Sequence, residues 1–152
     1  MTIRLSTGLR DGMLNATGMK EAFTNGVLYL YTGAQPASAD NAVSGTLLVI
    51  ISKDAGAFAF GAPGNGLNLA VPANGTVSKN ADNWLGNGIT DGTIGWFRLM
   101  GNPADALGSS TSLPRLDGSV ANSGADLNLG NIIVTAAAPF GVNTFSFTLP
   151  AQ

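Results

Sequence analysis

Residues 93–100 read Thr93-Ile94-Gly95-Trp96-Phe97-Arg98-Leu99-Met100, a run rich in β-branched and aromatic residues. Such residues favour strands, and the step Asp91-Gly92 before the run favours a tight turn. Trp96 and Phe97 are neighbours, so in a strand their side chains point to opposite faces of the sheet. We expect both to be buried, which requires a strand that is covered on both faces. The run therefore predicts a core strand with an aromatic anchor.

Tight turns are predicted on both sides of this strand and throughout the chain. Asn, Asp and Gly tolerate the positive φ angles that hairpin turns need. Asn-Gly or Asp-Gly occurs seven times, at Asp11-Gly12, Asn25-Gly26, Asn65-Gly66, Asn74-Gly75, Asn87-Gly88, Asp91-Gly92 and Asp117-Gly118. Most gaps between these steps are too short for a helix of normal length. We predict further strands at residues 27–32, 46–52, 57–60, 67–71, 76–79, 127–129, 132–135 and 142–149.

The last of these runs alternates clearly, because Phe145 and Phe147 share one face and the polar Thr144 lies on the other. About eight to ten strands separated by turns are typical of a β-sandwich or jelly roll. We therefore predict an all-β fold, a β-sandwich or jelly roll with a short, partly helical N-terminal arm. The arm is predicted to span residues 1–25 and the β-sandwich domain residues 26–152.

The first 25 residues have a different pattern, because apolar residues recur there every three or four positions. Gly12 and Gly18 interrupt the pattern, and each costs up to about 1 kcal/mol relative to Ala within a helix. We therefore expect one or two short helical turns. The segment either packs on the core of its own domain or docks on a neighbouring subunit. The second interpretation predicts an interface made by Leu5, Leu9, Met13, Leu14, Met19 and Phe23.

Charged residues are scarce, at 11% of the chain, whereas about 25% is usual. A soluble monomer normally carries more charge on its surface. The shortage indicates that part of the surface is covered by another protein. The alternative is a neutral surface rich in Ser, Thr and Asn that keeps the protein soluble by itself.

The composition also removes most catalytic and metal chemistry, because the chain has no His and no Cys. Nucleophilic triads and the usual zinc sites depend on those residues. The only carboxylates are Glu21 and eight Asp residues, and Asp11 and Asp117 each precede Gly, where Asp commonly caps its own turn. A cation held by Asp117, Asp126 and Asn128 is an alternative, but their spacing does not match an EF-hand. We expect no catalytic residues, no cofactor, no metal and no enzyme activity.

Nucleic acid and membranes are not expected as partners. The seven basic residues are scattered and form no stripe that would neutralise phosphates. The longest apolar stretch, residues 47–51, is far too short to cross a bilayer. The first twelve residues lack the apolar core of a signal peptide. We therefore expect the protein to be made in the cytoplasm and not to be exported by such a signal.

Carbohydrate binding is a serious alternative function, because jelly rolls often present aromatic side chains to sugars. Trp96 has apolar neighbours and is expected in the core. Trp84 lies in a polar, turn-rich region and is the candidate sugar contact. Its other interpretation is an aromatic that covers the core at a strand edge.

Five stretches of the sequence can be compared with known families. They are Ile3-Arg4-Leu5-Ser6-Thr7-Gly8-Leu9-Arg10-Asp11-Gly12-Met13-Leu14, Gly26-Val27-Leu28-Tyr29-Leu30-Tyr31-Thr32-Gly33-Ala34-Gln35-Pro36-Ala37-Ser38-Ala39-Asp40, Gly95-Trp96-Phe97-Arg98-Leu99-Met100-Gly101-Asn102, Leu113-Pro114-Arg115-Leu116-Asp117-Gly118-Ser119 and Ser123-Gly124-Ala125-Asp126-Leu127-Asn128-Leu129. Together they resemble a family of small virion proteins of tailed bacteriophages, and the likeness spans nearly the whole chain.

The resemblance implies a capsid cement or decoration protein with a jelly-roll fold, located in the virion and made in the host bacterial cytoplasm. The implied partners are the major capsid protein and copies of the chain itself, as a homo-oligomer on the particle. Alternatives are a carbohydrate-binding module associated with a tail or fibre, or another structural subunit of the tail or neck. The resemblance does not distinguish head, neck and tail.

Overall fold

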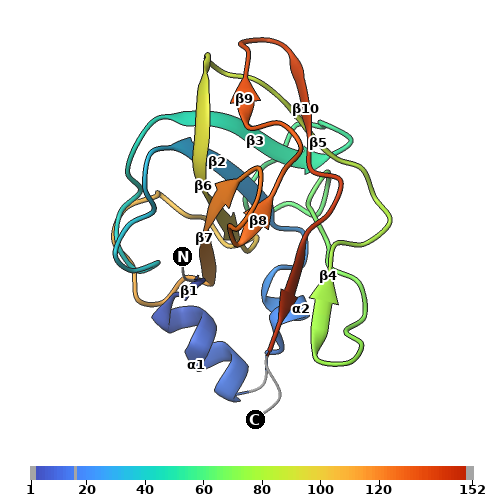
Figure 1. The fold of residues 1–152 in the computed structure, drawn as a ribbon. Helices are drawn as coiled ribbons and strands as arrows, with labels where there is room; N and C mark the ends of the chain where they lie inside the picture. Colours follow the sequence, from blue (N-terminus) through green and yellow to red (C-terminus); the bar gives the residue numbers. More distant parts are fainter. Residues whose placement is uncertain (1–2, 16, 150–152) are drawn as a thin grey trace.

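The computed structural model describes residues 3–15 and 17–149, and over this part the chain is built mainly from strands (Figure 1). The two helices are short, α1 (Thr7–Asn15) and α2 (Met19–Ala22). The strands are β1 (Arg4–Leu5), β2 (Val27–Thr32), β3 (Leu47–Lys53), β4 (Thr76–Ser78), β5 (Trp84–Asn87), β6 (Gly92–Met100), β7 (Arg115–Ala121), β8 (Leu127–Asn128), β9 (Ile133–Val134), β10 (Pro139–Gly141) and β11 (Ser146–Thr148). The predicted all-β class, with helix confined to the N-terminal segment, is confirmed.

One large sheet organises the molecule, with the strand order β1-β7-β6-β2-β3-β5-β10. β8 pairs in parallel with β7, β9 pairs with β6, and β11 and β4 form a separate two-stranded sheet. All the other pairs are antiparallel. The first strand and the seventh are therefore neighbours although they are far apart in the sequence.

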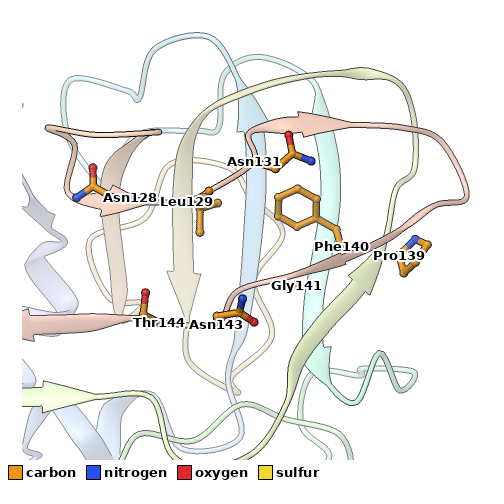
Figure 2. Close-up of a pocket in the computed structure, with 9 residues that line it drawn as sticks. Asn128, Leu129, Asn131, Pro139, Phe140, Gly141, Asn143 and Thr144 are labelled. Atoms are coloured by element: carbon orange, nitrogen blue, oxygen red, sulfur yellow. The ribbon is translucent and has the colours of Figure 1, made fainter.

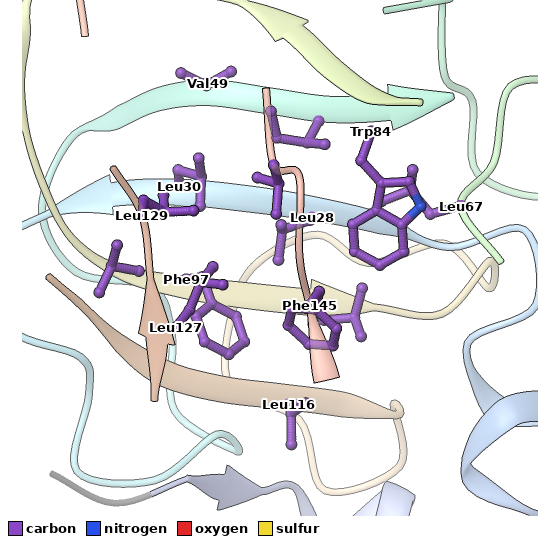
Figure 3. Packing of buried hydrophobic residues seen from close by; sticks show 14 of the residues in the cluster. Leu28, Leu30, Val49, Leu67, Trp84, Phe97, Leu116, Leu127, Leu129 and Phe145 are labelled. Carbon is purple, nitrogen blue, oxygen red and sulfur yellow. The ribbon is translucent and has the colours of Figure 1, made fainter. Parts of the chain in front are cut away.

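The core lies on one face of this sheet, where β2, β6 and β7 contribute aligned apolar side chains (Figure 3). Leu30 is in register with Phe97, and Leu28 with Leu99, which is in turn opposite Leu116. The chain from β8 to β11 returns over this face and adds residues such as Leu127, Leu129, Val142 and Phe145.

The other face of the sheet is covered by the loops that join β2 to β3 and β6 to β7. Trp96 stacks on Tyr31, with ring centroids 4.5 Å apart, and its Nε1 donates a hydrogen bond to the Ser44 carbonyl. Trp96 is 0% exposed and its neighbour Phe97 is 1% exposed. The prediction that both are buried in a strand covered on both faces is confirmed.

The N-terminal segment is fixed to the rest of the molecule by polar contacts around the start of α1. The Ser6 hydroxyl accepts a hydrogen bond from the Leu9 N–H, as an N-cap does, and another from the Arg115 N–H. The Asp40 carboxylate accepts two more, from the N–H and hydroxyl of Thr7, at 2.7 and 2.6 Å. Leu9 is buried in the same core as the strands. A boundary after residue 25 stays a prediction.

Some predicted strands are not formed. Residues 57–60 are irregular, and Phe58 packs against Phe60 edge to face, at 5.0 Å between ring centroids. Residues 67–71 contribute only isolated bridges, and the run at 142–149 becomes a strand only at β11. β7 contains the step Asp117-Gly118, for which we predicted a turn. The turn prediction is wrong there, because both residues pair with β6 in an extended strand. It is also wrong at Asp11-Gly12, which lies within α1.

Candidate functional site

Trp84, the predicted sugar contact, lies inside the core. It is 2% exposed, and its ring centroid is 5.4 Å from that of Phe145 (Figure 3). Lys79 Nζ lies 5.9 Å from the centroid of the Trp84 ring. A ring enclosed in this way presents no face on which a sugar could stack. Its burial agrees with the other interpretation, an aromatic that covers the core.

The three residues considered as cation ligands each make other contacts in the structure. Asp117 is fully buried and forms an ion pair with Arg98, at 2.7 Å. Asp126 accepts hydrogen bonds from the N–H and hydroxyl of Ser119, and Asn128 bonds to the backbone of Ala125. Among residues 3–15 and 17–149, no group of three or more Asp and Glu residues could hold a metal ion.

A second buried ion pair lies next to the first. Arg115 forms a bidentate contact with Asp105, with both N–O distances at 2.6 Å. Arg98 and Arg115 also donate to backbone carbonyls of the β2–β3 loop, at Asn41 and Ala39. The two arginines therefore hold the covering loops on the sheet by hydrogen bonds. Because both ion pairs are buried away from solvent, we interpret them as structural.

The six predicted interface residues divide into two groups. Leu9, Met19 and Phe23 are buried in the core of their own chain, as the alternative of a core-closing segment expects. Leu5 and Met13 are half-buried against that core, whereas Leu14 is 86% exposed. Buried residues offer no surface to a neighbour, so of these six residues a subunit contact can use only the exposed Leu14 and the accessible parts of Leu5 and Met13.

An apolar groove of about 250 Å³ lies where the N-terminal segment meets the two-stranded sheet. We use "apolar groove" for the surface lined by Met13, Gly18, Met19, Lys20, Glu21, Pro72, Gly75, Val77, Phe147 and Leu149. Its only charged members are Lys20 and Glu21, which pair with each other at 3.8 Å. Leu149 is 52% exposed in the groove, and Val71, next to Pro72, is 80% exposed. Three of the six large apolar side chains that are exposed among the described residues therefore lie in or beside this groove, namely Leu14, Val71 and Leu149.

A second cavity, of about 260 Å³, is polar and lies between the segment after β8 and the segment around β10 (Figure 2). We call it the polar groove, and its lining is Asn128, Leu129, Gly130, Asn131, Pro139, Phe140, Gly141, Asn143 and Thr144. No charged side chain lines it. A smaller cavity of about 140 Å³ shares Asn128 and Thr144 with it and extends to Asp126 and Ser146. Sequence reasoning missed this site, although Asn residues recur on both sides of β9.

No known protein family, curated protein or solved structure matches this chain. In the described ranges, neither helix is long and apolar enough to cross a membrane.

Proposed function

We propose that the protein is a structural component of a tailed-phage particle, a capsid cement or decoration protein that bridges neighbouring major capsid subunits. The observation that carries the proposal is the apolar groove together with the exposed Leu14, Val71 and Leu149 beside and within it. Exposed apolar surface of this kind marks sites of protein contact. The resemblance to small virion proteins and the low share of charged residues support the same conclusion.

The proposed action is mechanical and involves no catalytic step. A specific contact generally buries about 1,000 Å² or more in total, and weaker contacts gain strength when many copies bind one particle. Every bound copy stabilises the assembled shell relative to its dissociated subunits. The N-terminal segment is suited to such a surface because its inner face is fixed in the core, which leaves Leu14 and the Met13 edge presented rigidly.

The arrangement of the strands in two layers is part of the same proposal. We propose a β-sandwich or jelly-roll arrangement in which the β4–β11 sheet, together with the end of the large sheet at β10 and the segment after β8, covers the core face of the central strands. Their contribution of Val77, Leu129, Phe140 and Phe145 to one common core supports that description.

Locating the protein in an intact particle by cryo-EM tests the proposal. We expect density on the outer surface of the shell, over the contacts between capsid subunits, with the apolar groove facing the shell. Density on the tail or neck would overturn the decoration role and assign the alternative of a tail or neck subunit. Absence from the particle would overturn the virion assignment as a whole.

Rebinding of variants to shells that lack the protein tests whether the apolar groove, and not another part of the surface, contacts the shell. Leu14→Asp and Leu149→Asp change exposed side chains and should leave folding intact while lowering the number of bound copies. Ile89→Asp is the matched control, because Ile89 is also an exposed apolar residue and does not line the groove. Equal rebinding of all three variants and the wild type would exclude the groove as the docking face.

A further inference from the structure

We propose that the polar groove binds a neutral saccharide, with one sugar unit held between Asn128 and Asn131 on one side and Asn143 and Thr144 on the other. The groove shares no lining residue with the apolar groove, so this inference goes beyond the proposed shell contact. It also differs from sugar binding through Trp84, which is buried.

The first wall is rigid, because local turns hold both amide side chains. Asn131 Oδ1 accepts the Ile133 N–H at 2.9 Å, and Asn131 Nδ2 donates to the Ile133 carbonyl at 3.1 Å. Asn128 makes the same pair of bonds with Ala125, at 3.0 and 3.2 Å. Each amide keeps one further N–H and a free lone pair on its oxygen. A ligand therefore meets fixed donors and acceptors and does not have to order them.

The second wall has free hydrogen-bonding capacity. Within the part of the chain that the structure describes, the side chains of Asn143 and Thr144 have no hydrogen-bond partner, and their backbone groups have none either. Both residues are exposed. An amide offers donors and an acceptor, and a hydroxyl offers one of each. Neighbouring hydroxyls of a sugar ring, which donate and accept at adjacent positions, match this combination.

The floor of the groove is apolar. Phe140 and Leu129 are buried beneath the polar walls, and Figure 2 shows the Phe140 ring between Asn131 and Gly141. The C–H face of a sugar ring can pack on such a floor while its hydroxyls reach the walls. The volume of about 260 Å³ lies just below the range of about 300–1,000 Å³ typical of small-molecule sites, which suits a single sugar unit.

Two observations favour a neutral saccharide over other ligands. None of the described residues that line the groove is charged, and these residues offer no positive charge to a phosphate or carboxylate. An extended peptide would bind through backbone groups along an open strand edge, whereas the groove presents mainly side-chain groups, the amides of three Asn residues and the hydroxyl of Thr144.

Titration of the isolated, ¹⁵N-labelled protein tests the site, with glucose, galactose, mannose and N-acetylglucosamine as the probes. We expect at least one sugar to cause saturable shifts in the amide signals of residues 128–131 and 143–144. No saturable shift with any of the four sugars, or shifts confined to other regions, would overturn the proposal. Shifts of these amides by an uncharged extended peptide in place of the sugars would also overturn it.

Three variants test whether the sugar binds in the polar groove. Gly130→Phe should abolish it, because a Cβ on Gly130 meets open space and the ring would fill the groove without disturbing the backbone. Gly130→Ala adds one methyl group and should retain binding. Asn143→Ala should weaken the affinity about two- to tenfold, as the loss of one or two hydrogen bonds does.

Asn41→Ala is the control, since Asn41 is also exposed but lies in the loop on the opposite face of the sheet. Its affinity should equal that of the wild type. Unchanged affinity of folded Gly130→Phe would refute the location. The test uses no phage particle, so its failure leaves the shell-binding proposal standing, and a failure of shell binding leaves the saccharide site standing.

Discussion

Asp117 and Arg98 form a charged pair that is closed to water. Both side chains are 0% exposed, and Arg98 Nε and Nη2 each lie 2.7 Å from a carboxylate oxygen of Asp117. Removing two charges from water costs several kcal/mol for each ion, and good geometry offsets most of that cost. The pair contributes little net stability as a whole, but losing one partner leaves the other charge uncompensated.

Asp117→Ala should therefore destabilise the protein by about 3–5 kcal/mol, because Arg98 keeps its charge without a counter-ion. Asp11→Ala is the matched control, since Asp11 is exposed and should change the free energy of unfolding by no more than about 0.5 kcal/mol. Urea denaturation of both variants measures the difference. A loss of under 1 kcal/mol for Asp117→Ala would mean that Arg98 finds another partner.

Asp40 gives the junction between α1 and the β2–β3 loop a defined pH dependence. Desolvation raises the pKa of the Asp40 carboxyl, but the hydrogen bonds from Thr7 and the charges of Arg10 and Arg115 together outweigh it, so the net pKa is below its ordinary value. A lowered pKa in the folded state means that Asp40 stabilises the fold above its unfolded pKa of about 4. That contribution is lost as the pH falls through the folded pKa.

We expect the Thr7 amide signal to move as Asp40 titrates, with a midpoint below the ordinary Asp pKa of about 4. The Asp40→Asn variant should abolish that movement while retaining one acceptor oxygen. NMR titration measures it directly. A midpoint above 4 would contradict the assigned direction.

At single positions, prediction from the sequence succeeded where neighbours in the chain decide the environment. Trp96 and Phe97 are buried on opposite faces because adjacent strand residues point in opposite directions. Phe145 is also buried, but it precedes β11, and Phe147 on the same predicted face is only half-buried. At Asp117-Gly118 the prediction from neighbouring residues failed. The partner of Asp117 is Arg98, on another strand, and a Cβ at Gly118 would lie 2.6 Å from the Phe97 ring. Neither contact is visible within a window of a few residues.

Among the elements, α1 shows most clearly which face of a helix belongs to the core. Leu9 is 1% exposed and Leu14 is 86% exposed on the same helix. Leu9→Ala should cost about 2–5 kcal/mol, and Leu14→Ala should cost less than about 0.5 kcal/mol. Thermal or urea unfolding of the two variants measures both changes in the free energy of unfolding. Similar, small losses for both would show that the segment behaves as a detachable arm.

Element boundaries could be predicted where a single local signal dominates. The run that became β6 is one case, because its aromatic and β-branched residues are flanked by turn residues. Residues 57–60 have equally apolar side chains, but Phe58 and Phe60 pack on each other, and the described part of the chain has no backbone bridge between these residues and a strand. The polar groove could not be predicted, because its two walls come from segments that meet only after the chain has folded over the sheet.

Over the whole molecule, β2 and β6 should be the most protected region. Both strands have neighbours on both sides and cover on both faces. Amides of this kind exchange only through global unfolding, whereas edge elements open locally. We expect the slowest hydrogen exchange at residues 28–31 and 97–99, and faster exchange in β11, measured by NMR or mass spectrometry. Slowest exchange in the β4–β11 sheet would place the stable unit elsewhere.

The pairing of β1 with β7 has a consequence for how the protein is made. Leu5 lies opposite Leu116, so the first strand has no partner until roughly 110 further residues have been synthesised. At about 5–20 residues per second, that interval lasts between about 5 and 20 s on the ribosome. On the nascent chain, β1 therefore stays without its partner until β7 has been translated.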